Sequence, residues 1–375
     1  MRIAINTRLL LRGKMDGIGW FTAETARRLA TAHPKDEFFF FFDRKPAEEF
    51  VYAPNVTPVV LHPQARHPVL WYLFFEWSTR RALKRYKIDL YLSPDGYLPL
   101  HSNVPTVAVI HDINFEHASG NLKPSHQWFM HRYFPRYAQK ASRVATVSEY
   151  SRKDIATTYG ISKEKIDVVY DGAHNNYRPH SEEEKKNVLQ RFTGGCHYII
   201  FISTILKRKN LANLLLAFDM VKERSRDDRK LVVVGSRVWW QDELAEAYDN
   251  MRHKADVVMP GRVEPEDLSS LLSAADMLVY PSYFEGFGIP ILEAMYAETA
   301  VVASKTTSMP EVGGEAVLYI DPAKPHEIAE AIMKLDDDAL RNRLIERGRQ
   351  QRTLFSWDRT ACLLWDCMMK AIEKK

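Results

Sequence analysis

The stretch PSYFEGFGIPILEAM, residues 281–295, follows an apolar run and combines a glycine turn with the start of a helix. The apolar run predicts a buried strand, and Ile289 to Ala297 predicts a helix whose first turn tolerates Pro290. A helix that begins after such a turn presents backbone N–H groups and the positive end of its dipole to an anion. Glu285 precedes the turn and Glu293 lies in the helix. The segment therefore predicts an anion site flanked by two carboxylates.

Each carboxylate can accept paired hydrogen bonds from vicinal hydroxyls, such as those of a sugar or a ribose. A phosphate held between two polyols describes a nucleotide sugar. The alternative is that both glutamates are solvated residues around a helix start, where Glu is common. The complete string decides against this alternative, because both glutamates and the glycine turn occur together in one register.

The string resembles the signature of the retaining, nucleotide-sugar-dependent glycosyltransferases of the GT-B fold (glycosyltransferase group 1, family 4 type). That group contains sucrose synthase and many bacterial mannosyltransferases. The resemblance implies that Glu285 binds hydroxyls of the donor sugar and that Glu293 binds the ribose. It also implies that the loop between them binds the donor diphosphate through its backbone. The residues of this loop are Gly286, Phe287, Gly288 and Ile289.

Composition is that of a soluble globular protein, with 27% charged and 46% hydrophobic residues in a chain of 375. The N-terminus MRIAINTRLL indicates a strand rather than a signal peptide, and no run approaches the ~20 apolar residues of a membrane span. We therefore expect a cytoplasmic protein whose three cysteines are reduced. The net charge of +4 is modest and scattered, which argues against a nucleic-acid partner but permits an anionic one.

Strand and helix periods alternate along the chain, which predicts an α/β fold with parallel sheets covered by helices. The run Phe38–Phe42 is typical of a strand buried on both faces. The predicted strands of the first half are Arg2–Asn6, Glu37–Asp43, Pro58–His62, Asp89–Ser93, Thr106–Asp112 and Arg143–Ser148. Those of the second half are His197–Ser203, Lys230–Gly235, Val257–Pro260, Met277–Ser282, Ala300–Ser304 and Val317–Ile320. The segment Asp171–Gly195 has no strong period, and we interpret it as a linker.

Two α/β halves of similar size fit the GT-B plan, in which two Rossmann-like domains face each other across a cleft. We expect residues 1–178 to form the acceptor domain and residues 179–355 to form the donor domain. Residues 356–375 predict a final helix. The resemblance implies that this helix crosses back onto the first domain.

In the first half, Val107 to Asp112 predicts a buried strand with His111 at its carboxyl end, where α/β sheets bind ligands. A histidine there could also be structural. The resemblance implies that His111 contacts the transferring sugar or stabilises its positive charge, while Asp112 holds the loop. Near the N-terminus, Gly17 and Gly19 open a helix; the alternatives are a simple N-cap and, by resemblance, a loop facing the diphosphate and the acceptor.

In the second half, a basic loop that includes Arg208 and Lys209 precedes a helix. Cations at a helix N-terminus oppose the dipole, and a bound pyrophosphate would remove this penalty. The resemblance assigns both residues to the donor diphosphate. The chain has Ser203-Thr204 where many members carry Gly-Arg, so Arg208 is expected to compensate. By resemblance, the backbone near Val263 holds the nucleobase.

Two further stretches allow more than one interpretation. The aromatic and basic run Leu70–Arg85 fits either peripheral contact with the inner face of a membrane or a core-facing helix with a basic end. The run Asp336–Asp338 suggests helix capping rather than a metal site. The resemblance implies no metal and no cofactor.

The resemblance therefore implies a retaining glycosyltransferase for surface polysaccharide. The donor would be a nucleotide diphosphate sugar, with GDP-mannose the first expectation and UDP-sugars the second. The acceptor would be a glycan or a lipid-linked glycan. The alternatives are a GT-B epimerase, a phosphorylase, or a non-catalytic sugar-binding protein. A nicotinamide oxidoreductase is disfavoured, because no GxGxxG follows a strand.

Overall fold

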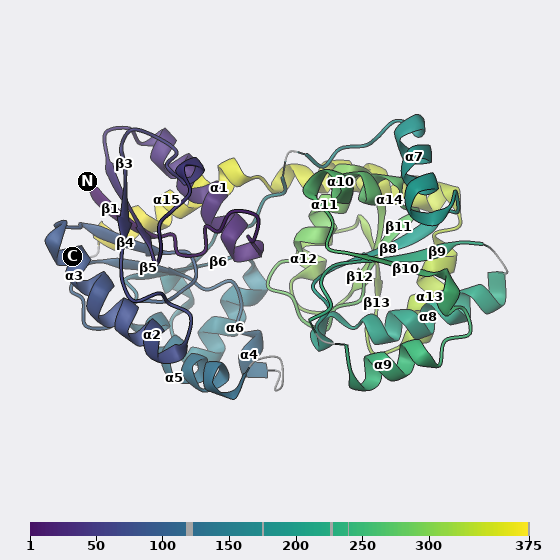
Figure 1. The fold of residues 1–375 in the computed structure, drawn as a ribbon, viewed down its shortest axis with the longest axis horizontal. Coiled ribbons are helices and arrows are strands. Elements are labelled where there is room, and N and C mark those ends of the chain that lie inside the picture. The colour runs from purple at the N-terminus through teal and green to yellow at the C-terminus, as the bar shows by residue number, and fades with distance from the viewer. Residues whose placement is uncertain (118–122, 175, 226–227, 239, 374–375) are drawn as a thin grey trace. The chain divides into compact units, whose positions relative to one another are not determined.

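The computed structural model describes residues 1–117, 123–174, 176–225, 228–238 and 240–373, which form two compact units (Figure 1). Unit 1 comprises Met1–Asp171 and Ser356–Lys375, and unit 2 comprises Gly172–Phe355. The first unit ends at Asp171, whereas we expected residue 178.

Unit 1 contains a parallel sheet of seven strands in the order β3-β2-β1-β4-β5-β6-β7. Its strands are β1 (Arg2–Asn6), β2 (Glu37–Phe42), β3 (Val56–Val60), β4 (Leu90–Ser93), β5 (Thr106–Val109), β6 (Arg143–Thr146) and β7 (Ile166–Val168). β1 has the predicted bounds, the next five strands correspond to predicted strands with shifted ends, and β7 was not predicted. The helices are α1 (Gly17–Ala32), α2 (Pro68–Tyr72), the π-helix η2 (Leu73–Thr79), α3 (Arg80–Arg85), α4 (Asn114–His117), α5 (Pro124–Lys140), α6 (Glu149–Tyr159) and α15 (Trp357–Glu373).

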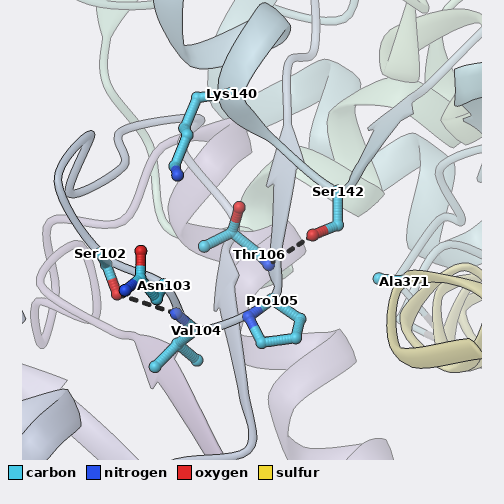
Figure 2. Close-up of a pocket in the computed structure, with 8 residues that line it drawn as sticks. All are labelled: Ser102, Asn103, Val104, Pro105, Thr106, Lys140, Ser142 and Ala371. Carbon is cyan, nitrogen blue, oxygen red and sulfur yellow. Dashed lines mark hydrogen bonds between the residues drawn. The ribbon is translucent and has the colours of Figure 1, made fainter. Parts of the chain in front are cut away.

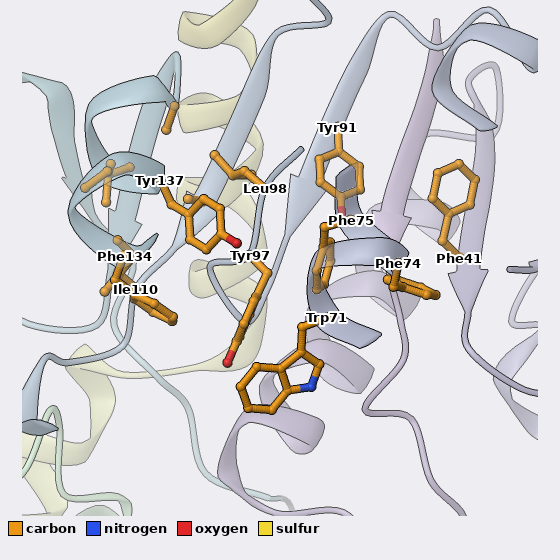
Figure 3. Packing of buried hydrophobic residues seen from close by; sticks show 14 of the residues in the cluster. Phe41, Trp71, Phe74, Phe75, Tyr91, Tyr97, Leu98, Ile110, Phe134 and Tyr137 are labelled. Carbon is orange, nitrogen blue, oxygen red and sulfur yellow. The ribbon is translucent and has the colours of Figure 1, made fainter. Parts of the chain in front are cut away.

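The core of unit 1 is rich in aromatic side chains, which explains the long aromatic run in the sequence. All five residues of Phe38–Phe42 are buried, as predicted for a strand covered on both faces. Figure 3 shows Phe41 in this core, together with Trp71, Phe75 and Tyr97 from other elements. The final helix α15 belongs to this unit, and its Trp357 ring lies 6.1 Å from Phe21 of α1.

Unit 2 contains a parallel sheet of six strands in the order β10-β9-β8-β11-β12-β13. Its strands are β8 (Tyr198–Ile202), β9 (Lys230–Val234), β10 (Val257–Gly261), β11 (Met277–Tyr280), β12 (Ala300–Ser304) and β13 (Val317–Ile320). Its helices are α7 (Glu182–Thr193), α8 (Leu211–Ser225), α9 (Asp242–Asp249), α10 (Pro265–Ala274), α11 (Ile289–Ala297), α12 (Met309–Gly313), α13 (Pro325–Lys334) and α14 (Asp338–Gln351). All six strands were predicted.

The interpretation of Asp171–Gly195 as a linker is wrong for its second half, which forms α7. Ser181 and Glu184 build a capping box at its start, and Gly194 ends it in the left-handed conformation. Only Thr193 of this helix is buried. A largely solvated helix gives a weak hydrophobic period, so its capping residues were the better signal.

The strand order of each sheet reverses at one point, between β1 and β4 in unit 1 and between β8 and β11 in unit 2. In open α/β sheets, ligands bind outside the carboxyl ends of the strands at such a switch point. The switch points therefore indicate where each unit would bind a ligand.

Candidate functional site

The switch point of unit 2 is occupied by a buried cluster around the Glu285 carboxylate. Lys209 Nζ donates to Glu285 Oε1 at 2.6 Å, and Arg208 Nη1 donates to Oε2 at 3.0 Å. The Tyr280 hydroxyl donates to Oε1 at 2.9 Å. The two cations follow β8 and Glu285 follows β11, so the reversal of strand order brings them together.

The charge balance of this cluster favours an anion. Burial alone would raise the pKa of Glu285, but the charges of Lys209 and Arg208 outweigh burial and lower the pKa to about 2. The carboxyl is therefore ionised at neutral pH. Two cations and one carboxylate give the trio a net positive charge.

The turn after Glu285 is shaped by its glycine and held by a side chain of the next loop, Ser308. Gly288 has φ +106°, which favours glycine, and it is the N-cap of α11. Because glycine has no side chain to cap the helix, the Ile289 N–H is left to another acceptor; Pro290 has no N–H, and Ile291 N donates to the Gly288 carbonyl at 2.9 Å. Ser308 Oγ lies 2.9 Å from the carbonyl oxygens of both Glu285 and Phe287, which share its single O–H donor. Gly286, Phe287 and Gly288 are buried, and Ile289 is half-buried.

Glu293 lies on α11 in a different electrostatic environment from Glu285. Its side chain is buried, and burial raises its pKa to about 7 although the Tyr177 hydroxyl donates a hydrogen bond to it. A buried carboxyl with one neutral donor retains capacity for further donors. Tyr177 lies in the predicted linker, and nothing in the sequence marked it.

Val263 follows β10, which β9 and β8 separate from β11 in the sheet. It is half-buried and lies on the same carboxyl edge as Glu285, but not beside it. The neighbouring strand ends are tightly spaced there. A Cβ on Gly235 would lie 1.8 Å from the Ser203 carbonyl oxygen, so only glycine fits.

In unit 1, His111 lies just after β5 and is half-buried. Its Nε2 donates to the Pro94 carbonyl at 2.9 Å, and the Phe21 ring lies edge-on at 4.8 Å. Burial lowers the pKa of His111, although the Pro94 carbonyl and Asp112 act in the opposite direction. The imidazole is therefore neutral at pH 7, with Nδ1 as an acceptor. Asp112 Oδ1 accepts from the Asn114 backbone at 2.9 Å, which fits its expected role in holding the loop.

The glycines of the N-terminal loop differ from each other in their surroundings. Asp16 is the N-cap of α1 and accepts from Gly19 N at 3.0 Å. A Cβ on Gly19 would lie 3.1 Å from the Leu9 carbonyl oxygen, whereas one on Gly17 would meet nothing within 4 Å. Gly19 therefore serves packing, while Gly17 is exposed. Because Phe21 of α1 contacts His111, the structure brings this helix start close to His111.

A polar network at the switch point of unit 1 was not predicted. Arg8 Nε donates to Asp95 Oδ2 at 2.7 Å, and Asn6 Nδ2 donates to Asp95 Oδ1 at 2.7 Å. The Arg8 guanidinium also lies 4.9 Å from the Tyr97 ring centroid. Asn6 is the last residue of β1, Arg8 follows β1, and Asp95 and Tyr97 follow β4; each looks ordinary in sequence. Only the strand order places them together.

A pocket of about 270 Å³ lies at the opposite edge of the same sheet, where β5 begins (Figure 2). Thr106 N donates to Ser142 Oγ beside it at 3.2 Å. The pocket is remote from the carboxyl ends of the strands. Among the residues that the structure describes, no group of three or more His, Cys, Asp or Glu could hold a metal ion. Asp337 caps α14, as expected for the acidic run.

The chain matches two protein-family models, one in each half. Residues 15–177 match the Glycosyltransferase Family 4 model, and residues 182–351 match the Glycosyl transferases group 1 model. A similar curated protein is O-antigen chain mannosyltransferase B of Escherichia coli, 31% identical over 356 residues, 92% of this chain and 93% of that one. O-antigen chain mannosyltransferase RfbU of Salmonella typhimurium is 26% identical over 288 residues, 76% of each.

Among solved structures, sucrose-phosphate synthase from Thermosynechococcus elongatus is similar, with a TM-score of 0.80 over 100% of both chains at 18% identity. At this identity the likeness shows the fold alone, and the fold is the predicted GT-B arrangement of two parallel-sheet domains. The two family models and the mannosyltransferase relative agree with it. The chain is therefore a member of the group 1, family 4 glycosyltransferases.

Proposed function

We propose that the protein transfers a hexosyl unit, with retention at the anomeric carbon, from a nucleotide diphosphate sugar to a hydroxyl acceptor. The observation that carries this proposal is the trio of buried Lys209, buried Glu285 and half-buried Arg208 next to the start of α11. Departure of the nucleotide diphosphate develops negative charge on its phosphate oxygens. The net positive charge of the trio and the Ile289 N–H at the start of α11 would stabilise that charge.

The two glutamates would bind different parts of the donor. Glu293 would accept from the two ribose hydroxyls in its ionised form. Glu285 would act mainly through the two cations that it holds. A carboxylate offers about four lone-pair positions, and Lys209, Arg208 and Tyr280 use three of them, so about one remains for a donor-sugar hydroxyl. His111 would accept a hydroxyl hydrogen bond at Nδ1. The family implies that the departing phosphate takes the acceptor proton, so this mechanism requires no separate base and no metal.

GDP-mannose is the first donor to test, because the relatives in the comparison are named O-antigen mannosyltransferases. The acceptor would be a glycan or a lipid-linked glycan of a surface polysaccharide. UDP-sugars are the second candidate, since a ribose clamp and a diphosphate site do not distinguish the two bases.

The donor can be tested by thermal denaturation of the purified protein with GDP, GDP-mannose, UDP and UDP-glucose, because a ligand raises the midpoint by mass action. We expect stabilisation by the GDP pair that disappears in Glu293→Gln and persists in Glu330→Gln, an exposed glutamate of α13. Stabilisation by UDP and UDP-glucose instead would make a UDP-sugar the donor in place of GDP-mannose. The absence of any response would favour a phosphorylase or a non-catalytic protein. NMR of the product anomer then tests retention.

A further inference from the structure

The helical run α2–η2–α3 of unit 1 has one face in the core and an unusual outer face. Its inner face places Trp71, Phe74 and Phe75 in the aromatic core (Figure 3). On its outer face the exposed fraction of the side chain is 62% for Val69 and 64% for Trp77. The exposed residues are apolar or aromatic in the first half and cationic in the second: Val69, Tyr72, Leu73, Trp77, Arg80, Arg81, Lys84 and Arg85.

Carboxylates are kept off this outer face. Glu76 is the only acidic residue between Arg66 and Lys87, and its side chain is buried. Its carboxylate accepts from Leu100 N at 2.6 Å and contacts His101 Nδ1 at 2.9 Å. The exposed cations therefore face solvent without an acidic neighbour on their own segment.

The adjacent helix α5 extends the same composition. Figure 1 shows α2 and α5 side by side, and the Tyr72 and Tyr133 rings lie 6.2 Å apart. Trp128 of α5 is 62% exposed. No acidic residue occurs in α5, whose basic residues are Arg132, Arg136 and Lys140. We call the exposed residues of 66–87 and 123–140 the aromatic-cationic face.

The charge of this face is out of proportion to that of the chain. Residues 66–87 and 123–140 contain ten Lys and Arg and only one acidic residue, the buried Glu76, whereas the whole chain has a net charge of +4. The rest of the chain is therefore net negative. A face that joins exposed Trp and Tyr to apolar and cationic neighbours is typical of peripheral contact with an anionic membrane surface.

The aromatic-cationic face is connected to the carboxyl edge of the unit 1 sheet. The Arg8 guanidinium, which follows β1, lies 5.8 Å from the Phe75 ring centroid on the inner face of η2. Trp71 Nε1 and Arg8 Nη1 both donate to the Ala65 carbonyl, at 2.8 Å and 3.4 Å. The helix that would touch the membrane thus borders the edge where unit 1 is expected to bind its ligand.

We propose that the aromatic-cationic face binds the surface of anionic phospholipid membranes. Val69, Tyr72, Leu73 and Trp77 would enter the headgroup boundary, and the cations of α3 and α5 would contact anionic headgroups. The proposed contact is peripheral. No helix in the described part of the chain is long and apolar enough to cross a bilayer. The inference does not depend on the proposed function; if both hold, the acceptor edge lies where a lipid-linked glycan is available.

Co-sedimentation of the full chain with vesicles tests this proposal. We expect binding to phosphatidylcholine vesicles that contain phosphatidylglycerol, weakening with salt, and little binding to pure phosphatidylcholine. The triple variant Arg80→Gln/Arg81→Gln/Lys84→Gln should bind about 100-fold more weakly, at the usual contribution of each cation near a charged surface. The matched control removes three exposed cations elsewhere: Lys35→Gln, Lys186→Gln and Arg343→Gln.

Insertion is tested separately with Trp77→Ser, which should weaken vesicle binding without changing the thermal midpoint. Equal binding by the triple variant and its control would overturn the proposal, as would failure of the wild type to bind anionic vesicles. A concentration-dependent dimer that Trp77→Ser dissociates would instead assign the face to a second copy of the chain. Vesicle binding is read without turnover, so failure of the glycosyltransferase proposal would not affect this result.

Discussion

Replacement of Glu293 by glutamine should stabilise the ligand-free protein and weaken its binding of nucleotide. The Glu293 carboxyl is buried, and one neutral donor, the Tyr177 hydroxyl, bonds to it. Glutamine has the same size and keeps an oxygen that accepts from Tyr177. The substitution therefore removes the buried charge while it preserves the packing and the hydrogen bond.

The size of the gain follows from the raised pKa. Burial moves the pKa of Glu293 from 4.5 to about 7. Between these values the folded protein holds a proton that the unfolded chain releases, so stability falls as pH rises through the interval. Above pH 7 the full cost is present, about 3 kcal/mol at about 1.4 kcal/mol per pH unit. Glu293→Gln should recover this amount at pH 8 and almost none at pH 4.5.

Urea unfolding of the wild type and of Glu293→Gln at pH 5 and pH 8 measures this difference, with Glu330→Gln as the exposed control. Equal stability of wild type and Glu293→Gln at pH 8 would refute the assignment of a buried, charged Glu293. Nucleotide binding by the same variant should fall about 10- to 100-fold, the usual value of hydrogen bonds to a charged group. A more stable protein that binds less nucleotide would indicate a carboxylate retained for its ligand.

Three further predictions follow from the same structure. Nucleotide affinity of the wild type should decrease as pH falls below 7, because Glu293 becomes protonated; titration calorimetry at pH 6 and pH 8 measures this. Lys209→Met should abolish transfer. Its loss of stability in urea unfolding should stay below the about 3–5 kcal/mol of a fully unpaired buried charge, because Arg208 still pairs with Glu285, and Lys209→Met/Glu285→Gln should regain stability but not activity. Gly235→Ala should fail to fold or lose several kcal/mol, because its Cβ would lie 1.8 Å from the Ser203 carbonyl oxygen. Gly160→Ala, with positive φ but nothing within 4 Å, should cost only about 1 kcal/mol by thermal denaturation.

The strands and the glycine turn of unit 2 could be predicted because the residues that determine them lie close together in the sequence. The glutamates, the glycine turn and the start of α11 fall within fifteen residues, and each has a local cause. Gly288 needs a positive φ, and Pro290 fits the first turn of a helix. The strands of this unit are short, continuous apolar runs, and this pattern is typical of strands buried on both faces. The sequence also marked Lys209 and Arg208, since cations before a helix need an explanation.

Unit 1 was harder because its candidate ligand edge depends on residues far apart in the chain. Arg8 and Asp95 are separated by 87 residues, and neither stands in a motif. Their contact follows from the position of β4 beside β1, which the order of predicted strands alone does not give. Tyr177 was not predicted as a site residue for a related reason. It lies in a segment without periodic structure, and only the fold brings it to Glu293.

The C-cap of α11 has a left-handed backbone although its residue is not glycine. The structure gives Glu298 a φ of +59° at the C-cap of α11. Its carboxylate accepts from Arg349 at 2.6 Å, and Arg352 lies 3.7 Å away. These contacts offset the cost of a left-handed conformation without glycine, and they are not visible in a local sequence pattern.

One end of the candidate donor site has excess positive charge and the other has a buried carboxyl group. Together these two ends restrict which ligands the site can bind. Lys209 and Arg208 carry two positive charges against the one negative charge of Glu285. This end of the site therefore favours a bound monoanion or dianion over a cation. Glu293 is a buried carboxyl that is costly to ionise and accepts from one neutral donor. Ligand hydroxyls that donate to it would stabilise its ionised form, whereas a phosphate would not. A free phosphate would neutralise only the excess positive charge, and a free sugar would donate hydrogen bonds only to the Glu293 carboxylate. A nucleoside diphosphate carries both groups on one molecule, and for this reason we expect it to stabilise the protein more than inorganic pyrophosphate or mannose alone.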